Sequence, residues 1–81
     1  VEDCKELLDY GLSEEEKQTE TCFSTYYAEI MIQLALYFGF DGWFFNIENP
    51  LPALYSKKMV YFLQYFTLRM HEQIPHSKVL W

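Results

Sequence analysis

Residues 39–50 read GFDGWFFNIENP, and this stretch decides how the rest of the chain is arranged. Gly39 closes a helical pattern, as a glycine just past a helix C-terminus does. Residues 43–47 are aromatic or β-branched with one polar exception, which predicts a short buried strand. Pro50 has no N–H to donate to a neighbouring strand, so the strand must end before it. The stretch therefore predicts the end of a helix, a strand over about 42–48, and a loop.

This strand would carry a carboxamide and a carboxyl group on one face. Side chains two positions apart in a strand point to the same side, so Phe44, Asn46 and Glu48 project together. Hydrolysis of a glycosidic bond needs a proton donor at the leaving oxygen, and Glu48 could supply that proton. No second carboxylate shares the face, because Asp41 falls on the opposite side of the strand.

A 2-acetamido sugar can replace the missing nucleophile, since its acetamido carbonyl can attack the anomeric carbon and form an oxazolinium ion. Asn46, two residues before the acid, is placed to orient the acetamido N–H. The alternative is structural: Asn46 satisfies backbone groups at the strand end, and Glu48 forms a surface ion pair. Spacing alone leaves both interpretations open.

The composition limits the chain to one small domain. It has 81 residues, a formal net charge of −6 and 20% aromatic residues, and a core of this size is marginal. We expect many of the rings to face neighbours outside the chain. The acidic balance argues against nucleic acid and anionic membranes, and no apolar run approaches the roughly 18 residues of a membrane span. Cys4 and Cys22 are more typical of unpaired thiols in a reducing compartment than of a disulfide.

Helical spacing predicts two helices before the strand. The first covers about residues 1–10 and ends at Gly11. Ser13 then fits the N-cap of a capping box with Glu16 three residues on, and the acidic run that follows is either the start of the next helix or a solvated loop. The second helix covers about 21–38. Its expected buried face consists of Tyr27, Ile30, Met31, Leu34, Ala35 and Phe38.

A third helix and a second strand follow the loop. The prolines at 50 and 52 forbid an immediate helix, so Ser56 is the expected N-cap of a helix that runs to about Gln73. Pro75 lies just past its end, and residues 77–81 begin the second strand. The expected buried face of this helix consists of Met59, Phe62, Leu63, Phe66 and Met70.

The order helix, helix, strand, helix, strand predicts an α/β fold with two parallel strands, about 42–48 and 77–81. A strand, a crossover helix and a second strand form the parallel unit of such proteins, and strands covered on both faces read as apolar runs. Two parallel strands alone do not make a stable sheet. We therefore expect residues 1–81 to be a part of a (β/α)8 TIM barrel with flanking helices and no internal boundary. In such barrels the chemistry lies at the C-terminal ends of the strands.

Residues 40–49, FDGWFFNIEN, closely resemble the signature of glycoside hydrolase family 85, the endo-β-N-acetylglucosaminidases. The family typically reads F-D-G-W, an aliphatic or aromatic residue, then x-N-x-E-N. The resemblance covers most of the chain after about residue 22 and, more loosely, the first helix. Departures are small: two phenylalanines stand at 44 and 45 where relatives are often aliphatic, and Pro50 follows the motif.

By this resemblance Glu48 is the general acid/base and Asn46 orients the 2-acetamido group, with Asn49 and Phe44 as expected substrate contacts. The family cleaves the bond between the two core GlcNAc residues of N-glycans with retention, and many members also transglycosylate. The resemblance implies N-glycans, free oligosaccharides or glycopeptides as partners, the cytosol as the location, and no cofactor. Because 81 residues cannot close around a glycan, we expect the isolated chain to be inactive.

Three other interpretations remain. Glycoside hydrolase family 18, the chitinase-like enzymes, reads D-G-x-D-x-D-x-E, but Phe44 and Asn46 stand where two of its acids belong. A non-catalytic glycan-binding relative would keep the motif without the chemistry. A helical partner-binding module would explain the aromatic excess as an exposed patch, although the strand motif argues against it.

The sequence predicts no metal site. His71 and His76 are five residues apart with a proline between them, and neither cysteine lies near them. His71, at the C-terminal end of a helix, is expected to be structural.

Overall fold

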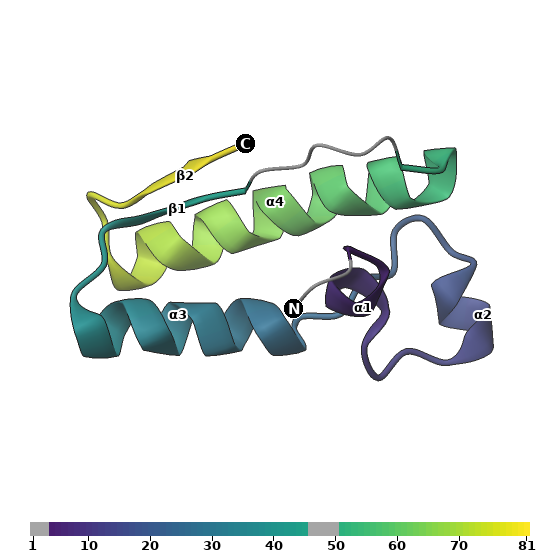
Figure 1. The fold of residues 1–81 in the computed structure, drawn as a ribbon, viewed down its shortest axis with the longest axis horizontal. Coiled ribbons are helices and arrows are strands. Elements are labelled where there is room, and N and C mark those ends of the chain that lie inside the picture. The colour runs from purple at the N-terminus through teal and green to yellow at the C-terminus, as the bar shows by residue number, and fades with distance from the viewer. Residues whose placement is uncertain (1–3, 46–50) are drawn as a thin grey trace.

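The computed structural model describes residues 4–45 and 51–81 (Figure 1). Its elements are α1 (Cys4–Asp9), α2 (Glu14–Lys17), α3 (Tyr26–Phe38), β1 (Gly42–Phe44), α4 (Ala53–Gln73) and β2 (Lys78–Leu80). β1 and β2 pair in parallel, with α4 between them in the chain. The prediction of two parallel strands connected by a helix is therefore confirmed, over shorter strands than expected.

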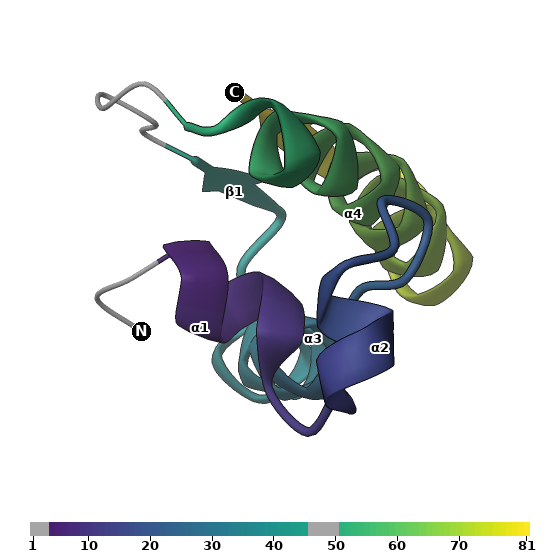
Figure 2. The ribbon, with the colours of Figure 1, turned by 90° about the vertical axis from the view of Figure 1, so that its right-hand side faces the viewer.

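The two long helices lie side by side and run in the same direction, opposite to the strands (Figure 1). β1 points toward the end of the molecule where α4 begins, and α1 packs against α4 near that end. Figure 2 looks at this end: α1 and α2 lie in front of α3, and α4 begins above them. No helix within the described part of the chain has the length and apolar character to span a lipid bilayer.

Local signals at the helix ends are confirmed. Gly39 adopts a left-handed conformation with φ of 76°, and its N–H donates to the carbonyl of Ala35 over 2.8 Å. The capping box is formed: Ser13 Oγ accepts from the Glu16 N–H over 3.1 Å, and the Ser13 N–H donates to Glu16 Oε1 over 2.9 Å. Both signals depend on neighbours within four residues, so the sequence alone could show them.

Two predicted helix starts are wrong. α3 begins at Tyr26 and not near residue 21, because the chain before it crosses α1, where the Ser24 N–H donates to the Leu8 carbonyl over 2.6 Å. α4 begins at Ala53 and not after Ser56. A proline at a helix start loses no hydrogen bond, because the first N–H groups of a helix have no partner in the helix.

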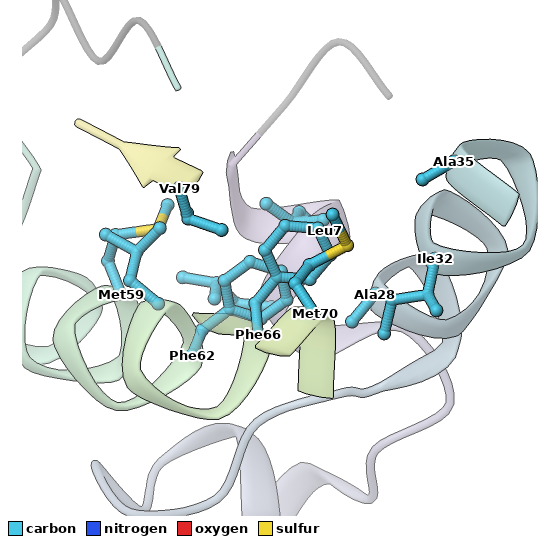
Figure 3. Packing of buried hydrophobic residues seen from close by; sticks show 11 residues of the cluster. Leu7, Ala28, Ile32, Ala35, Met59, Phe62, Phe66, Met70 and Val79 are labelled. Carbon is cyan, nitrogen blue, oxygen red and sulfur yellow. The ribbon is translucent and has the colours of Figure 1, made fainter. Parts of the chain in front are cut away.

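The core lies between α4, the strands and the helices α1 and α3 (Figure 3). All five predicted residues of α4 are buried, and α4 side chains occupy the middle of this packing. The predicted face of α3 is wrong in part, because Ile30, Leu34 and Phe38 are exposed. The buried residues of α3 are Ala28, Ile32 and Ala35. The two alanines let α3 approach its neighbours closely, and the larger apolar side chains beside them turn outward.

Many aromatic rings are exposed, as the composition predicts. Tyr37 is 82% exposed, Phe44 69% and Phe38 61%. Tyr37 packs edge-on against Phe38 with ring centroids 4.7 Å apart, and Phe38 stacks on Phe40 with centroids 5.8 Å apart.

Gly42 leaves no room for a side chain between the two strands. A Cβ atom added there would stand 2.6 Å from the carbonyl oxygen of Lys78, the residue paired with Gly42 in β2. Gly42→Ala should therefore push the strands apart and destabilise the full-length protein by about 1–3 kcal/mol, the usual cost of overpacking. Thermal unfolding would measure this loss.

Gly39→Asn is the control for this prediction. Gly39 has open space around it, so asparagine there meets no clash and strains only the left-handed backbone, which asparagine adopts more readily than most residues. The control should lose less stability than Gly42→Ala. An unchanged melting temperature in Gly42→Ala would show that the strands do not approach as closely as described.

Candidate active site

Three of the four predicted site residues, Asn46, Glu48 and Asn49, lie outside the described residues, so their predicted roles stay predictions. Phe44 is described, and it ends β1 on the open face of the sheet. Its partner across the parallel pair is Leu80, which is 56% exposed on the same face.

The opposite face of the sheet packs against the helices. Trp43 pairs with Val79, which is only 8% exposed and belongs to the core. Phe45 packs edge-on against Phe62 and Phe66 of α4, with ring centroids 6.0 and 5.5 Å away. The predicted alternation is thus confirmed from 43 to 45: the even position faces outward and the odd positions face α4.

The chain is held at both sides of residues 46–50. Before them, the Phe45 N–H continues the sheet by donating to the Leu80 carbonyl over 2.8 Å. After them, Leu51 packs against the core and its carbonyl accepts from Ser56 Oγ over 3.3 Å. Residues 46–50, which we call the motif segment, therefore join two fixed points, one in the sheet and one just before α4.

A buried charged cluster lies in the first two turns of α4, and the sequence analysis missed it. Lys58 is fully buried, and its Nζ donates to Asp9 Oδ1 over 2.7 Å and to the Glu16 carbonyl over 3.4 Å. The Tyr55 hydroxyl donates to Asp9 Oδ2 over 2.6 Å, and Lys58 Nζ lies 5.5 Å from the centre of the Tyr55 ring. We call Asp9, Tyr55 and Lys58 the Asp9 cluster.

Helical spacing carried a signal for one member of this cluster, Lys58. Lys58 lies four residues before Phe62 and three after Tyr55, so it falls on the buried face of α4. A lysine on such a face needs an acidic partner, because an unpaired buried charge is strongly unfavourable. Nothing in the spacing pointed to Asp9, which is 49 residues away in the chain.

A second polar network connects α3 to the later turns of α4. Glu29 accepts from Arg69 Nε and Nη2, each over 3.1 Å, and from the Tyr65 hydroxyl over 2.5 Å. The hydrogen bonds from Arg69, and then from Tyr65, hold the pKa of the Glu29 carboxyl below its ordinary value. Burial, together with the bond to Glu29, raises the pKa of Tyr65.

The lowered pKa of Glu29 predicts a pH-dependent contribution to stability. This contribution is complete above the ordinary Glu pKa of 4.5 and is lost as the pH falls through the lowered value. The full-length protein should therefore melt at a higher temperature than its Arg69→Met variant above pH 4.5, and the difference should shrink below it. Lys57→Met, which removes an exposed pair with Glu20, should change little at either pH. A difference that is constant across pH 4.5 would contradict the assignment.

No group of three metal-ligating side chains occurs in residues 4–45 and 51–81. His71 Nε2 lies 3.0 Å from the Ser77 carbonyl, so this histidine links the end of α4 to the start of β2, as a structural residue would. Cys22 carries a free thiol.

Comparison with known proteins gives one consistent result. The profile described as glycosyl hydrolase family 85 matches residues 1–81. Proteins named cytosolic endo-beta-N-acetylglucosaminidase from Mus musculus and Homo sapiens are 44% and 43% identical to the chain over 54 residues. A protein named cytosolic endo-beta-N-acetylglucosaminidase 1 from Arabidopsis thaliana is 36% identical over 78 residues.

These matches cover much of this chain and little of the relatives. They take in 67% of the chain for the mouse and human proteins and 96% for the Arabidopsis protein. The chain spans only 7% of the two animal proteins and 10% of the plant protein. No solved structure matches the chain.

Proposed function

Because the chain belongs to glycosyl hydrolase family 85, we propose that it is part of the catalytic domain of an endo-β-N-acetylglucosaminidase. The full-length protein cleaves the GlcNAc-β1,4-GlcNAc core of N-glycans, on glycopeptides or free oligosaccharides. The observation that carries this proposal is the family match over the whole chain, together with the motif at residues 40–49. The names of the mouse and Arabidopsis relatives support it.

The chemistry we propose is substrate-assisted hydrolysis with retention. The acetamido carbonyl of the substrate attacks the anomeric carbon, and the bond to the leaving oxygen breaks as Glu48 donates its proton to that oxygen. Asn46 orients the acetamido group for the attack, while Phe44 and Asn49 contact the sugar. Water, deprotonated by Glu48, then opens the oxazolinium ion. The exposed position of Phe44 on the open face of β1 supports this arrangement, because Asn46 and Glu48 would share that face in a strand that continued to residue 48, as the sequence predicts.

The domain we propose is a (β/α)8 barrel, to which residues 1–81 contribute two adjacent strands without an internal boundary. Support comes from the parallel pair β1 and β2, from helices that run opposite to the strands, and from the apolar open face. In a barrel this face would point to the interior and β1 would end at the catalytic side. The sugar subsites would come from other strands, so the isolated chain would be inactive.

We also place the full-length protein in the cytosol. The names of the animal and plant relatives support this location, and so does the free thiol of Cys22, since reduced cysteines are typical of that compartment.

The test is to incubate the full-length protein with a high-mannose glycopeptide and to weigh the products by mass spectrometry. An endoglycosidase leaves one GlcNAc on the peptide and releases a glycan that ends in the other. A peptide without sugar, with aspartate in place of the glycosylated asparagine, would indicate an amidase. An unchanged glycopeptide in the presence of folded protein would overturn the proposal in favour of a glycan-binding relative.

A further inference from the structure

The start of α4 has little of the local stabilisation that helix starts usually have. Pro52 occupies the N-cap position and makes no side-chain capping bond, and the first turn carries no acidic residue. The first N–H groups of a helix ordinarily donate to a capping side chain, and a carboxylate in the first turn stabilises their partial positive charge. Among the residues that the structure describes, the Ser56 hydroxyl bonds the Leu51 carbonyl at this end, and further support comes from outside α4.

The Asp9 cluster supplies that support from another element. Tyr55 and Lys58 lie one turn apart on α4, and each bonds a different oxygen of the Asp9 carboxylate. Two directional bonds to one carboxylate fix both the rotation of α4 about its axis and its distance from α1. Apolar contacts, which lack direction, would fix neither so closely.

The position of this cluster relates it to the motif. α4 begins at Ala53, two residues after Leu51, the residue at which the chain leaves residues 46–50. At the other side of this segment the sheet already holds Phe45 through Leu80. The cluster therefore adds to the contacts of Leu51 that fix the chain just after residues 46–50.

We propose that Asp9, Tyr55 and Lys58 are positioning residues for the active site, an inference that rests on the proposed function. They fix the start of α4, and through it the point where the segment with Asn46 and Glu48 rejoins the fold. Catalysis depends on such placement, because a displacement of about 1 Å can cost about 100-fold in rate. If the cluster only stabilised the protein, a variant without it that is as stable as the wild type would keep its full rate.

The chain offers a matched pair of variants to separate these roles. Tyr55→Phe and Tyr65→Phe each remove one hydroxyl that bonds a carboxylate from a neighbouring helix, and both rings are half-buried on α4. Tyr65 belongs to the Glu29 network, ten positions further from the motif. In the full-length protein, both variants should lower the melting temperature by similar amounts. Only Tyr55→Phe should lower kcat on the glycopeptide, by about tenfold or more, with KM unchanged.

A combined variant tests the same point at restored stability. Asp9→Leu, Tyr55→Phe and Lys58→Met together replace the charged cluster by apolar side chains, an exchange that often leaves stability unchanged or higher. We expect a melting temperature near that of the wild type and a kcat reduced about tenfold or more. Should this variant fail to fold, the matched tyrosine pair decides the question.

The outcomes separate this inference from the proposed function. A wild type that cleaves, with kcat equally affected in Tyr55→Phe and Tyr65→Phe, would overturn the positioning role and leave the proposed function standing. Full kcat in the folded combined variant would do the same. A folded wild type that does not cleave would overturn both.

Discussion

Glu48→Gln in the full-length protein is expected to abolish cleavage of natural N-glycans. Glutamine keeps the size and polarity of the side chain but cannot donate a proton to the leaving sugar oxygen, which departs poorly as an anion. General acid catalysis contributes about 10²- to 10⁴-fold to such reactions, so the loss in kcat should fall in or above this range. Mass spectrometry of the glycopeptide, or quantification of released glycan, would measure it.

Two comparisons make this result specific to the proton donor. Glu14→Gln removes a carboxylate that is 90% exposed on α2, and it should leave kcat unchanged. A synthetic substrate with an acidic phenol as leaving group needs less protonation, so Glu48→Gln should lose much less activity on it. Near-normal turnover of the natural glycan by Glu48→Gln would show that the acid lies elsewhere.

Asn46→Ala is expected to block formation of the oxazolinium ion and to spare its later reactions. Without the carboxamide the acetamido group is no longer held for attack, and kcat on the glycopeptide should fall by about 100-fold or more. A preformed sugar oxazoline bypasses this step, because its ring is already closed. Since Glu48 is intact, the variant should still transfer the oxazoline to a GlcNAc acceptor at a substantial fraction of the wild-type rate.

For Asn46→Ala the measurement is the rate of glycopeptide cleavage divided by the rate of transfer from the oxazoline. Glu48→Gln serves as its counterpart, because loss of the acid/base should also slow activation of the acceptor hydroxyl during transfer. An equal loss on glycopeptide and oxazoline would indicate that Asn46 supports the local fold and does not orient the acetamido group.

The sequence predicted the local features of this fold well, because their causes lie within a few residues. Gly39 ends α3 since glycine adopts the left-handed conformation without strain. Ser13 and Glu16 cap α2 by reaching one another across three positions. The apolar face of α4 was equally clear, because polar residues mark its opposite side.

The wrong predictions concern a helix whose faces do not differ in polarity and helix starts that depend on contacts with distant residues. α3 is apolar nearly all round, so periodicity could not choose between Ile30 or Leu34 and the face with Ile32 that contacts the core. Ser56 was a plausible cap by type, yet its hydroxyl bonds back to the Leu51 carbonyl from inside α4.

The candidate site divides in the same way. The roles proposed for Asn46 and Glu48 could be named from the sequence because both residues lie in one short motif, and these roles stay predictions. The positioning residues that we propose could not be predicted together, because Asp9 is far from α4 in the sequence and contacts it only in the folded chain. Lys58 could have been suspected from its place on the apolar face, but its partner could not.

The Asp9–Lys58 pair also constrains the order in which this part of the protein folds. Asp9 leaves the ribosome 49 residues before its partner, a delay of roughly 2 to 10 s at about 5–20 residues per second. Until α4 has been synthesised, Leu8 and Ile32, which are fully buried in the finished fold, lack the α4 side chains of their shared core. α1 and α3 can therefore complete their packing only after α4 has left the ribosome.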